Sequence, residues 1–150
     1  MPFVALIPDG RPAITSLMNA FFAAVSFAPG EKPTYDDLKR LCIPAARLIR
    51  TSGESPEIAT VDEFIQVRET AFAAGGLRSF QETELRARTD MFGNVAQRYS
   101  PYRKRVETEI GTTESRGVIT TQFIRTPGGW RIASMAWDDE RPGLELAEPW

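Results

Sequence analysis

The spacing of apolar residues changes once along this chain, and this change constrains the fold more than any other feature. Through the first half, apolar residues mostly recur every three or four positions, which is typical of amphipathic helices. From Leu77 onward they mostly alternate, which is typical of half-buried strands. A tight turn at Phe92-Gly93 and another over 126–129 separate the later strands. The sequence therefore predicts a helical half followed by an antiparallel half, with the outline of an open cone.

Three helices are predicted before this change. The first carries an apolar face from Ile14 to Val25. The second is short, begins at Thr34 and is stopped by Pro44. The third begins at the capping-box sequence Thr60-Val61-Asp62-Glu63 and ends at a pair of glycines.

Strands are predicted in both halves, although most lie in the second. One short strand precedes the third helix, two form a hairpin, and two close the chain. Their ranges are 45–51, 77–90, 94–103, 117–125 and 130–137. The polar stretch 107–115 predicts a loop between the hairpin and the closing strands.

The composition predicts one globular domain. The chain has 150 residues, 42% of them apolar and 25% charged, and we expect a single domain over 1–150 with an arm at 1–10 and a tail at 139–150. The net charge is −2 and no apolar run is long enough to span a bilayer, so neither nucleic acid nor a membrane is an expected partner. The single cysteine, Cys42, permits no disulfide within the chain, which fits a cytoplasmic location.

The chain contains no histidine, and this limits its chemistry. An imidazole base, a Ser-His or Cys-His pair and a histidine metal ligand are all excluded. Acid–base chemistry at neutral pH would need a carboxylate, tyrosine or lysine whose pKa is shifted. The acidic run Asp138-Asp139-Glu140 lacks metal-ligand spacing and predicts a solvated strand end, so neither a metal nor another cofactor is expected.

Polar side chains gather on one face of the predicted hairpin. If Phe92-Gly93 is a two-residue turn, Arg88 lies opposite Gln97 and Arg86 opposite Tyr99. Side chains alternate between the faces of a strand, so one face then holds the following six residues. They are Glu82, Glu84, Arg86, Arg88, Gln97 and Tyr99.

Two interpretations of this face remain open. In the first it lines a pocket, where Glu84 is a base with a raised pKa and Arg86 and Tyr99 bind or polarise a carbonyl or carboxylate. In the second it is a solvated or dimer-facing surface with cross-strand charge pairs. A β-bulge in either strand would move part of the set to the opposite face.

Two tryptophans are predicted on the last strand. Trp130 and Trp137 are an odd number of residues apart, so we expect their side chains on opposite faces of the sheet. The full set of expected ligand contacts is Glu82, Arg88, Gln97, Phe21 and Trp137.

The order of elements and several short motifs resemble the nuclear-transport-factor-2-like (NTF2-like) superfamily, and more narrowly its SnoaL-like and DUF4440-like bacterial members. The motifs are Phe80 to Arg88, Phe92 to Gln97, Ser100-Pro101-Tyr102, Ser115-Arg116-Gly117 and Gly129 to Glu140. The resemblance implies a cystatin-like α+β cone, in which about three N-terminal helices pack on a curved antiparallel sheet. It also implies a homodimer formed through the sheet.

The resemblance implies a small-molecule pocket but leaves its use open. One implied function is an isomerase, cyclase or dehydratase that uses a carboxylate base. The alternative is a non-catalytic module of the same fold that binds a ligand or another protein. Relatives often place histidine where Arg86 and Gln97 stand here, so an imidazole mechanism is not carried over to this chain.

Overall fold

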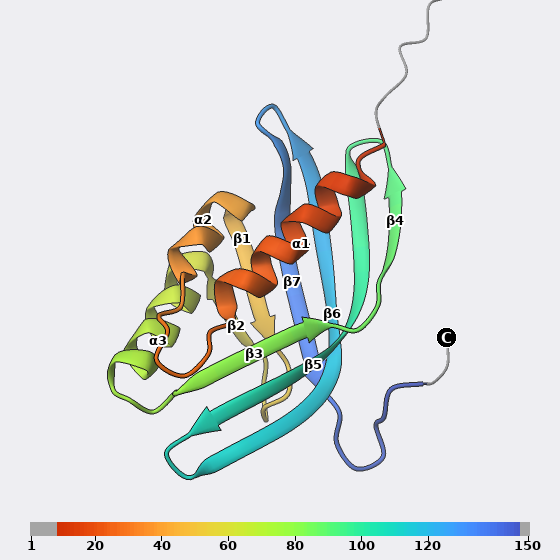
Figure 1. The fold of residues 1–150 in the computed structure, drawn as a ribbon. Helices are drawn as coiled ribbons and strands as arrows, with labels where there is room; N and C mark the ends of the chain where they lie inside the picture. The colour runs from red at the N-terminus through yellow and green to blue at the C-terminus, as the bar shows by residue number, and fades with distance from the viewer. Residues whose placement is uncertain (1–8, 148–150) are drawn as a thin grey trace, which may run out of the picture.

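The computed structural model describes residues 9–147, and this part of the chain forms three α-helices and a short 3₁₀ turn packed on one seven-stranded sheet (Figure 1). Residues 1–8 of the predicted arm and 148–150 of the predicted tail lie outside the described residues. The helical elements are α1 Arg11–Val25, η1 Tyr35–Asp37, α2 Leu38–Leu41 and α3 Val61–Ala73. The strands are β1 Cys42–Arg50, β2 Glu57–Thr60, β3 Ser79–Glu84, β4 Arg88–Phe92, β5 Val95–Thr108, β6 Gly111–Thr126 and β7 Gly129–Asp139.

The three predicted helices are present, and each follows from its sequence. α1 starts with a proline in its first turn and buries Ile14, Met18 and Phe22 against the sheet. In α3, the Glu63 amide donates to Thr60 Oγ1 and the Thr60 amide donates to Glu63 Oε1, each at 3.1 Å, so the capping box is confirmed. Figure 1 shows α1 lying across one side of the sheet, with α2 and α3 beside β1.

The strand order is β2-β1-β7-β6-β5-β3, and β4 also pairs with β5. All pairs are antiparallel except β1 and β7, which run parallel, so the prediction of a wholly antiparallel sheet is wrong at this pair. Parallel pairing is possible here because most of the chain, rather than a tight hairpin, connects the two strands. Pro44, predicted to stop the second helix, lies inside β1 at an irregular stretch of the pairing with β7, where its missing N–H is tolerated.

The long β5–β6 hairpin replaces the loop predicted over 107–115. Pairing continues to Thr108 opposite Gly111, and both strands at this end carry exposed polar side chains. The polarity of this stretch therefore reflects a ribbon that is solvated at its tip, not irregular backbone. β2 was also missed, since it is only four residues long and directly precedes α3.

A bulge between β3 and β4 changes which side chains share a face. Glu84 pairs with Tyr102 and Arg88 pairs with Tyr99, so the three residues 85–87 lie opposite the two residues 100–101. The predicted register is also wrong by two residues, because the hairpin turn lies one position later, at Gly93-Asn94, with a positive φ of 56° at Gly93. Glu82 and Glu84 consequently lie on the concave face, whereas the Arg88 side chain lies on the convex face.

A second irregularity brings Trp130 and Trp137 to the same face. The pairing of β7 with β6 shifts between Ile132 and Ser134, which inverts the alternation and contradicts the prediction of opposite faces. Trp130 is buried against the start of α1, where a Cβ on Gly10 would come within 2.6 Å of the indole nitrogen. Trp137 packs edge-to-face on Phe64 of α3, with ring centroids 6.1 Å apart.

Two further findings concern the expectations about membrane spans and the single cysteine. Among residues 9–147 no helix combines the length and apolarity needed to cross a bilayer. Cys42 is buried, and this burial raises the pKa of its thiol to about 11, so the thiolate is not populated at neutral pH. The homodimer through the sheet stays a prediction.

Candidate functional site

The concave face carries two polar clusters, and the first is built around Arg98 of β5. Arg98 donates from Nε and Nη2 to the two oxygens of Glu84 at 3.0 and 2.7 Å, and its Nη1 donates to the hydroxyls of Thr15 and Thr89 at 3.2 and 3.0 Å. Ser100 donates a further hydrogen bond to Glu84 at 2.7 Å. The two charged side chains are only 8% and 16% exposed. This is a buried, bidentate and well-satisfied ion pair, which ties α1, β3, β4 and β5 together.

The second cluster begins with Asp139 at the end of β7. Lys104 of β5 donates to Asp139 Oδ2 at 2.9 Å, and the Tyr102 hydroxyl donates a short hydrogen bond to the other oxygen. Burial raises the pKa of Tyr102 well above its usual range, and the nearby Asp139 adds to this effect. The tyrosine therefore stays protonated and, together with Lys104, holds the carboxylate in place.

Glu82 of β3 lies beside this cluster, because its strand position pairs with Lys104. Burial raises the pKa of its carboxyl to about 7; Lys104 and Arg68 oppose this shift and Asp139 adds to it. Among residues 9–147 no side chain donates a hydrogen bond to this carboxyl; only the Glu82 backbone is bonded, to the Ser26 hydroxyl. At neutral pH part of the Glu82 population is therefore ionised, and this form can accept a proton.

Arg68 of α3 is the fourth charged group of this region. Its guanidinium carbon lies 4.8 Å from the ring centroid of Phe64 and 5.0 Å from that of Phe80. Burial lowers the pKa of Arg68, and the nearby Tyr35 and Glu82 counteract this. The buried Tyr35 hydroxyl lies close to the guanidinium, but the two groups fall short of normal hydrogen-bond geometry. Within the described residues no carboxylate lies within ion-pair distance of Arg68.

A cavity of about 430 Å³ opens between α3 and the sheet, with Arg68 in its wall. Its apolar lining is Leu48, Ile58, Ala59, Phe64, Val67 and Trp137. Arg50, Glu57 and Glu63 supply the remaining polar wall. A cavity of this size and character suits a small organic molecule.

A larger cavity, of about 510 Å³, lies on the convex face under the C-terminal segment 144–147. Tyr99, Val118 and Thr120 line it, but Glu82, Arg68 and Lys104 do not. We place the candidate site in the smaller cavity, because Arg68 is part of its wall and lies close enough to Glu82 for the two groups to influence each other's pKa. Glu82 and Lys104 themselves do not line this cavity.

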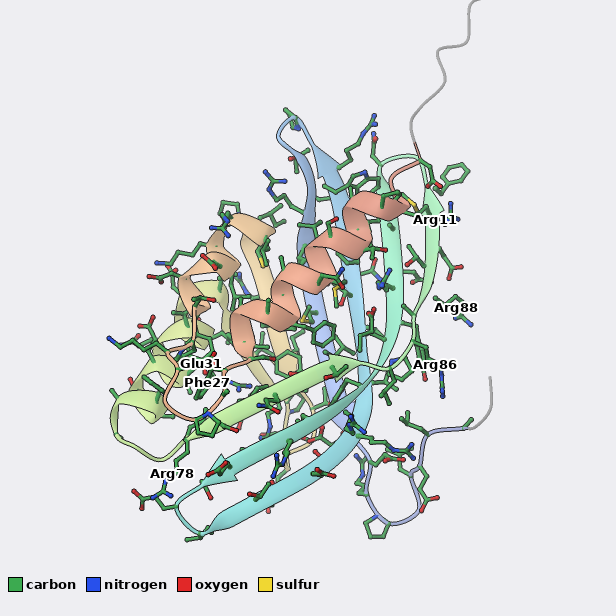
Figure 2. The ribbon with its side chains drawn as sticks, viewed as in Figure 1. Arg11, Phe27, Glu31, Arg78, Arg86 and Arg88 are labelled. Carbon is green, nitrogen blue, oxygen red and sulfur yellow. The ribbon has the colours of Figure 1, made fainter. Side chains whose placement is uncertain are left out.

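The structure divides the predicted site residues between the two faces. Figure 2 shows Arg86 and Arg88 on the side of the β3–β4 segment turned away from α1. There Arg86 donates to the Ala147 carbonyl at 3.1 Å, and Arg88 lies 5.8 Å from the ring centroid of Tyr99. Gln97 is on the same side and donates to Asp90 at 3.3 Å. The prediction that these four residues share a face with Glu82 and Glu84 is wrong, because of the bulge over 85–87.

The other predicted residues lie on the concave side but in different settings. Glu84 is engaged by Arg98 and Ser100, so the catalytic set Glu84, Arg86 and Tyr99 has no common face. Phe21 is buried in the core and does not line the cavity, whereas Trp137 forms part of its wall.

Several residues of the site were missed from the sequence. Arg68 follows Phe64 by four positions and therefore lies on the buried side of α3, whereas Val67, predicted as part of the apolar stripe, is 68% exposed. The run 138–140 is only partly solvated: the side chains of Asp138, Asp139 and Glu140 are 36%, 20% and 21% exposed, and each carboxylate has a cationic partner. Among the described residues no group of three histidine, cysteine or acidic side chains is placed to hold a metal ion.

Comparisons with known proteins place the fold. No protein-family model and no curated protein matches this sequence. Among solved structures, an NTF2-like superfamily protein from Salmonella enterica serovar Typhimurium is 14% identical with a TM-score of 0.72, and 93% of this chain and 96% of that chain are covered. An uncharacterized protein with a cystatin-like fold from Caulobacter vibrioides is 12% identical with a TM-score of 0.69, over 89% of this chain and 92% of that one.

The similar structures also include enzymes. Hexachlorocyclohexane dehydrochlorinase LinA-type3 from Novosphingobium barchaimii is 13% identical with a TM-score of 0.72, over 93% of this chain and 95% of that one. The chain therefore has the NTF2-like, cystatin-like α+β fold that its motifs predicted. At these identities the likeness establishes the fold and not the activity.

Proposed function

We propose that this protein binds a small organic molecule in the cavity beside α3 and that Glu82 acts on it as a general base. The observation that carries the proposal is the carboxyl of Glu82, which has a pKa of about 7 and no hydrogen-bond donor among the described side chains. A base is most effective when its pKa lies near the working pH. Glu82 meets this condition in a chain that has no histidine.

The neighbouring groups suit proton transfer next to a carbonyl, as in an isomerase, cyclase or dehydratase. Arg68 lines the cavity and carries the positive charge that would stabilise an oxyanion formed when a carbon acid loses its proton. Lys104 is held by Asp139 and stabilises the ionised form of Glu82. The fold likeness to a dehydrochlorinase is consistent with this class, as an analogy of fold only.

The proposal is tested first by the titration of Glu82. In protein labelled with ¹³C at glutamate carboxyls, we expect one resonance, absent from Glu82→Gln, to titrate near pH 7. The protein is then incubated in D₂O with a panel of small ketones and carboxylic acids, and deuterium incorporation is measured by mass spectrometry. The wild type should label at least one compound, and Glu82→Gln should not. Titration of the Glu82 carboxyl near pH 4.5, or equal labelling by wild type and Glu82→Gln, contradicts the proposed base. Saturable binding of a compound by the wild type without labelling favours a non-catalytic binding module.

The raised pKa also predicts how stability depends on pH. Between the ordinary pKa of 4.5 and the folded value of about 7, the folded protein keeps a proton that the unfolded chain has released. The contribution of Glu82 to stability therefore falls as pH rises through this window and is lost above pH 7. We expect Glu82→Gln to match the wild type near pH 4.5 and to be more stable at pH 8, by on the order of 1–3 kcal/mol in urea unfolding. A variant that is less stable than the wild type at pH 8 would show that the carboxylate stabilises the fold.

A further inference from the structure

The guanidinium of Arg68 is the least satisfied charged group that faces the cavity. Its guanidinium carbon lies over the rings of Phe64 and Phe80. The N–H groups of a guanidinium point outward in its plane, and no described carboxylate reaches those of Arg68 within ion-pair distance. Glu82 is close enough to influence its pKa, but this carboxyl is itself half protonated near pH 7. Arg68 therefore keeps its capacity to bind an anion in the wall of the cavity.

The other cation of the cavity wall is already paired. Arg50 lies 3.5 Å from Glu57 at the rim, where the two side chains are 43% and 69% exposed. Arg68 thus supplies one available positive charge; Glu82 is close enough to influence it, and Asp139 is close enough to influence Glu82. A doubly charged phosphate would be repelled by these acids, whereas a carboxylate carries one charge and matches the planar fork of a guanidinium in a bidentate pair.

The remaining residues of the cavity wall determine the polarity and size of the uncharged part of the ligand. Leu48, Ile58, Val67 and the edge-to-face pair of Phe64 and Trp137 offer apolar surface around one charged end. Such a lining favours an apolar or aromatic body and gives few hydrogen bonds to hydroxyls or amides. A cavity of about 430 Å³ has room for a body of one ring and a short chain.

We propose that the ligand of this cavity is an apolar monocarboxylic acid whose carboxylate is bound by Arg68. This inference deepens the proposed function, on which it rests for the choice of cavity, and it names the substrate class. Because Glu82 lies close to Arg68, a carbon next to that carboxylate, or one conjugated with it, is the part of the ligand that would come nearest to Glu82. Arg68 then has a binding role, and its charge orients the molecule for the base.

The inference is tested with a matched pair of probes, 3-phenylpropanoate and 3-phenylpropanamide, measured by isothermal titration calorimetry on the intact chain. The two differ only in the charged end, so we expect the wild type to bind the acid at least about tenfold more tightly, as a charge-assisted bidentate pair gives. Arg68→Gln should remove this preference and still bind the amide with wild-type affinity, which shows that the variant is folded. Arg50→Gln is the matched control, since it removes a cation from the same cavity but should keep most of the preference.

Three results overturn the inference. They are equal affinity of the wild type for acid and amide, a preference for the acid that survives in Arg68→Gln, and no saturable binding of either probe. The Glu82 titration is an independent measurement, so the two proposals fail separately. If the acid binds through Arg68 but Glu82 titrates near 4.5, the base is wrong and the carboxylate site stands.

Discussion

Two glutamates of β3, only two positions apart, lie on the same concave face in opposite surroundings. Glu84 receives two hydrogen bonds from Arg98 and one from Ser100. Arg98 donates two further hydrogen bonds, to the hydroxyls of Thr15 and Thr89. Glu82 receives none from a described side chain, and Arg68 has no ion-pair partner among the described residues. Each glutamate therefore has an arginine nearby. We call the Glu84–Arg98 pair closed, because hydrogen bonds join the two side chains, and the Glu82–Arg68 pair open, because none does.

The contrast separates a structural role from a functional one. A closed buried pair has all its donors and acceptors used and is costly to break, so it fixes the positions of the elements that meet there. An open pair next to a cavity leaves its hydrogen-bonding capacity for a ligand and leaves one carboxyl with a perturbed pKa. Both clusters contain one glutamate and one arginine, so residue type does not distinguish them and the geometry of the contacts does.

The largest effect is expected where the closed pair is broken. Arg98→Ala leaves the Glu84 carboxylate buried without its partner, so we expect a loss of about 3–5 kcal/mol in the free energy of unfolding, measured by urea denaturation. The double variant Arg98→Met with Glu84→Leu removes both charges and should recover much of that loss. A loss below about 1 kcal/mol in Arg98→Ala would show that the pair is no more than a surface bridge.

A second effect concerns the open pair and its neighbours. Lys104 lowers the pKa of Glu82 and Asp139 raises it, so variants at these positions should move the Glu82 titration in opposite directions. We expect Lys104→Met to raise the pKa and Asp139→Asn to lower it, as measured by ¹³C NMR of the carboxyl. A shift in the same direction for both variants would mean that the Lys104–Asp139 pair acts only by holding the local backbone.

The sequence predicts the elements well because their signals are local. The apolar face of α1, the capping box at Thr60 and Glu63 and the turn over 126–129 each occupy a few neighbouring residues. The site depends on long-range pairing and is predicted poorly. A single extra residue over 85–87 inverts the faces beyond it, and nothing in residue type marks that bulge.

The sequence also does not predict that Glu82 and Glu84 have different surroundings. Both are acids at alternate positions of one strand, and their difference comes from which arginine each one meets. Arg98 arrives from the paired strand and Arg68 from a helix more than ten residues earlier in the chain. Only the folded chain shows that one guanidinium reaches its carboxylate and the other faces a cavity.

The smallest effect is expected on the convex face, and it tests the bulge directly. Without the bulge, alternation would place Arg88 on the face of Glu82 and Glu84, where loss of its charge would alter the Glu82 titration. In the structure Arg88 is exposed beside Asp90, with 65% of its side chain accessible. Arg88→Gln should therefore change the free energy of unfolding by less than about 0.5 kcal/mol and leave the titration of Glu82 unchanged. A clear shift of that titration would place Arg88 on the concave side and would remove the geometric basis for treating the two glutamates as one closed and one open pair.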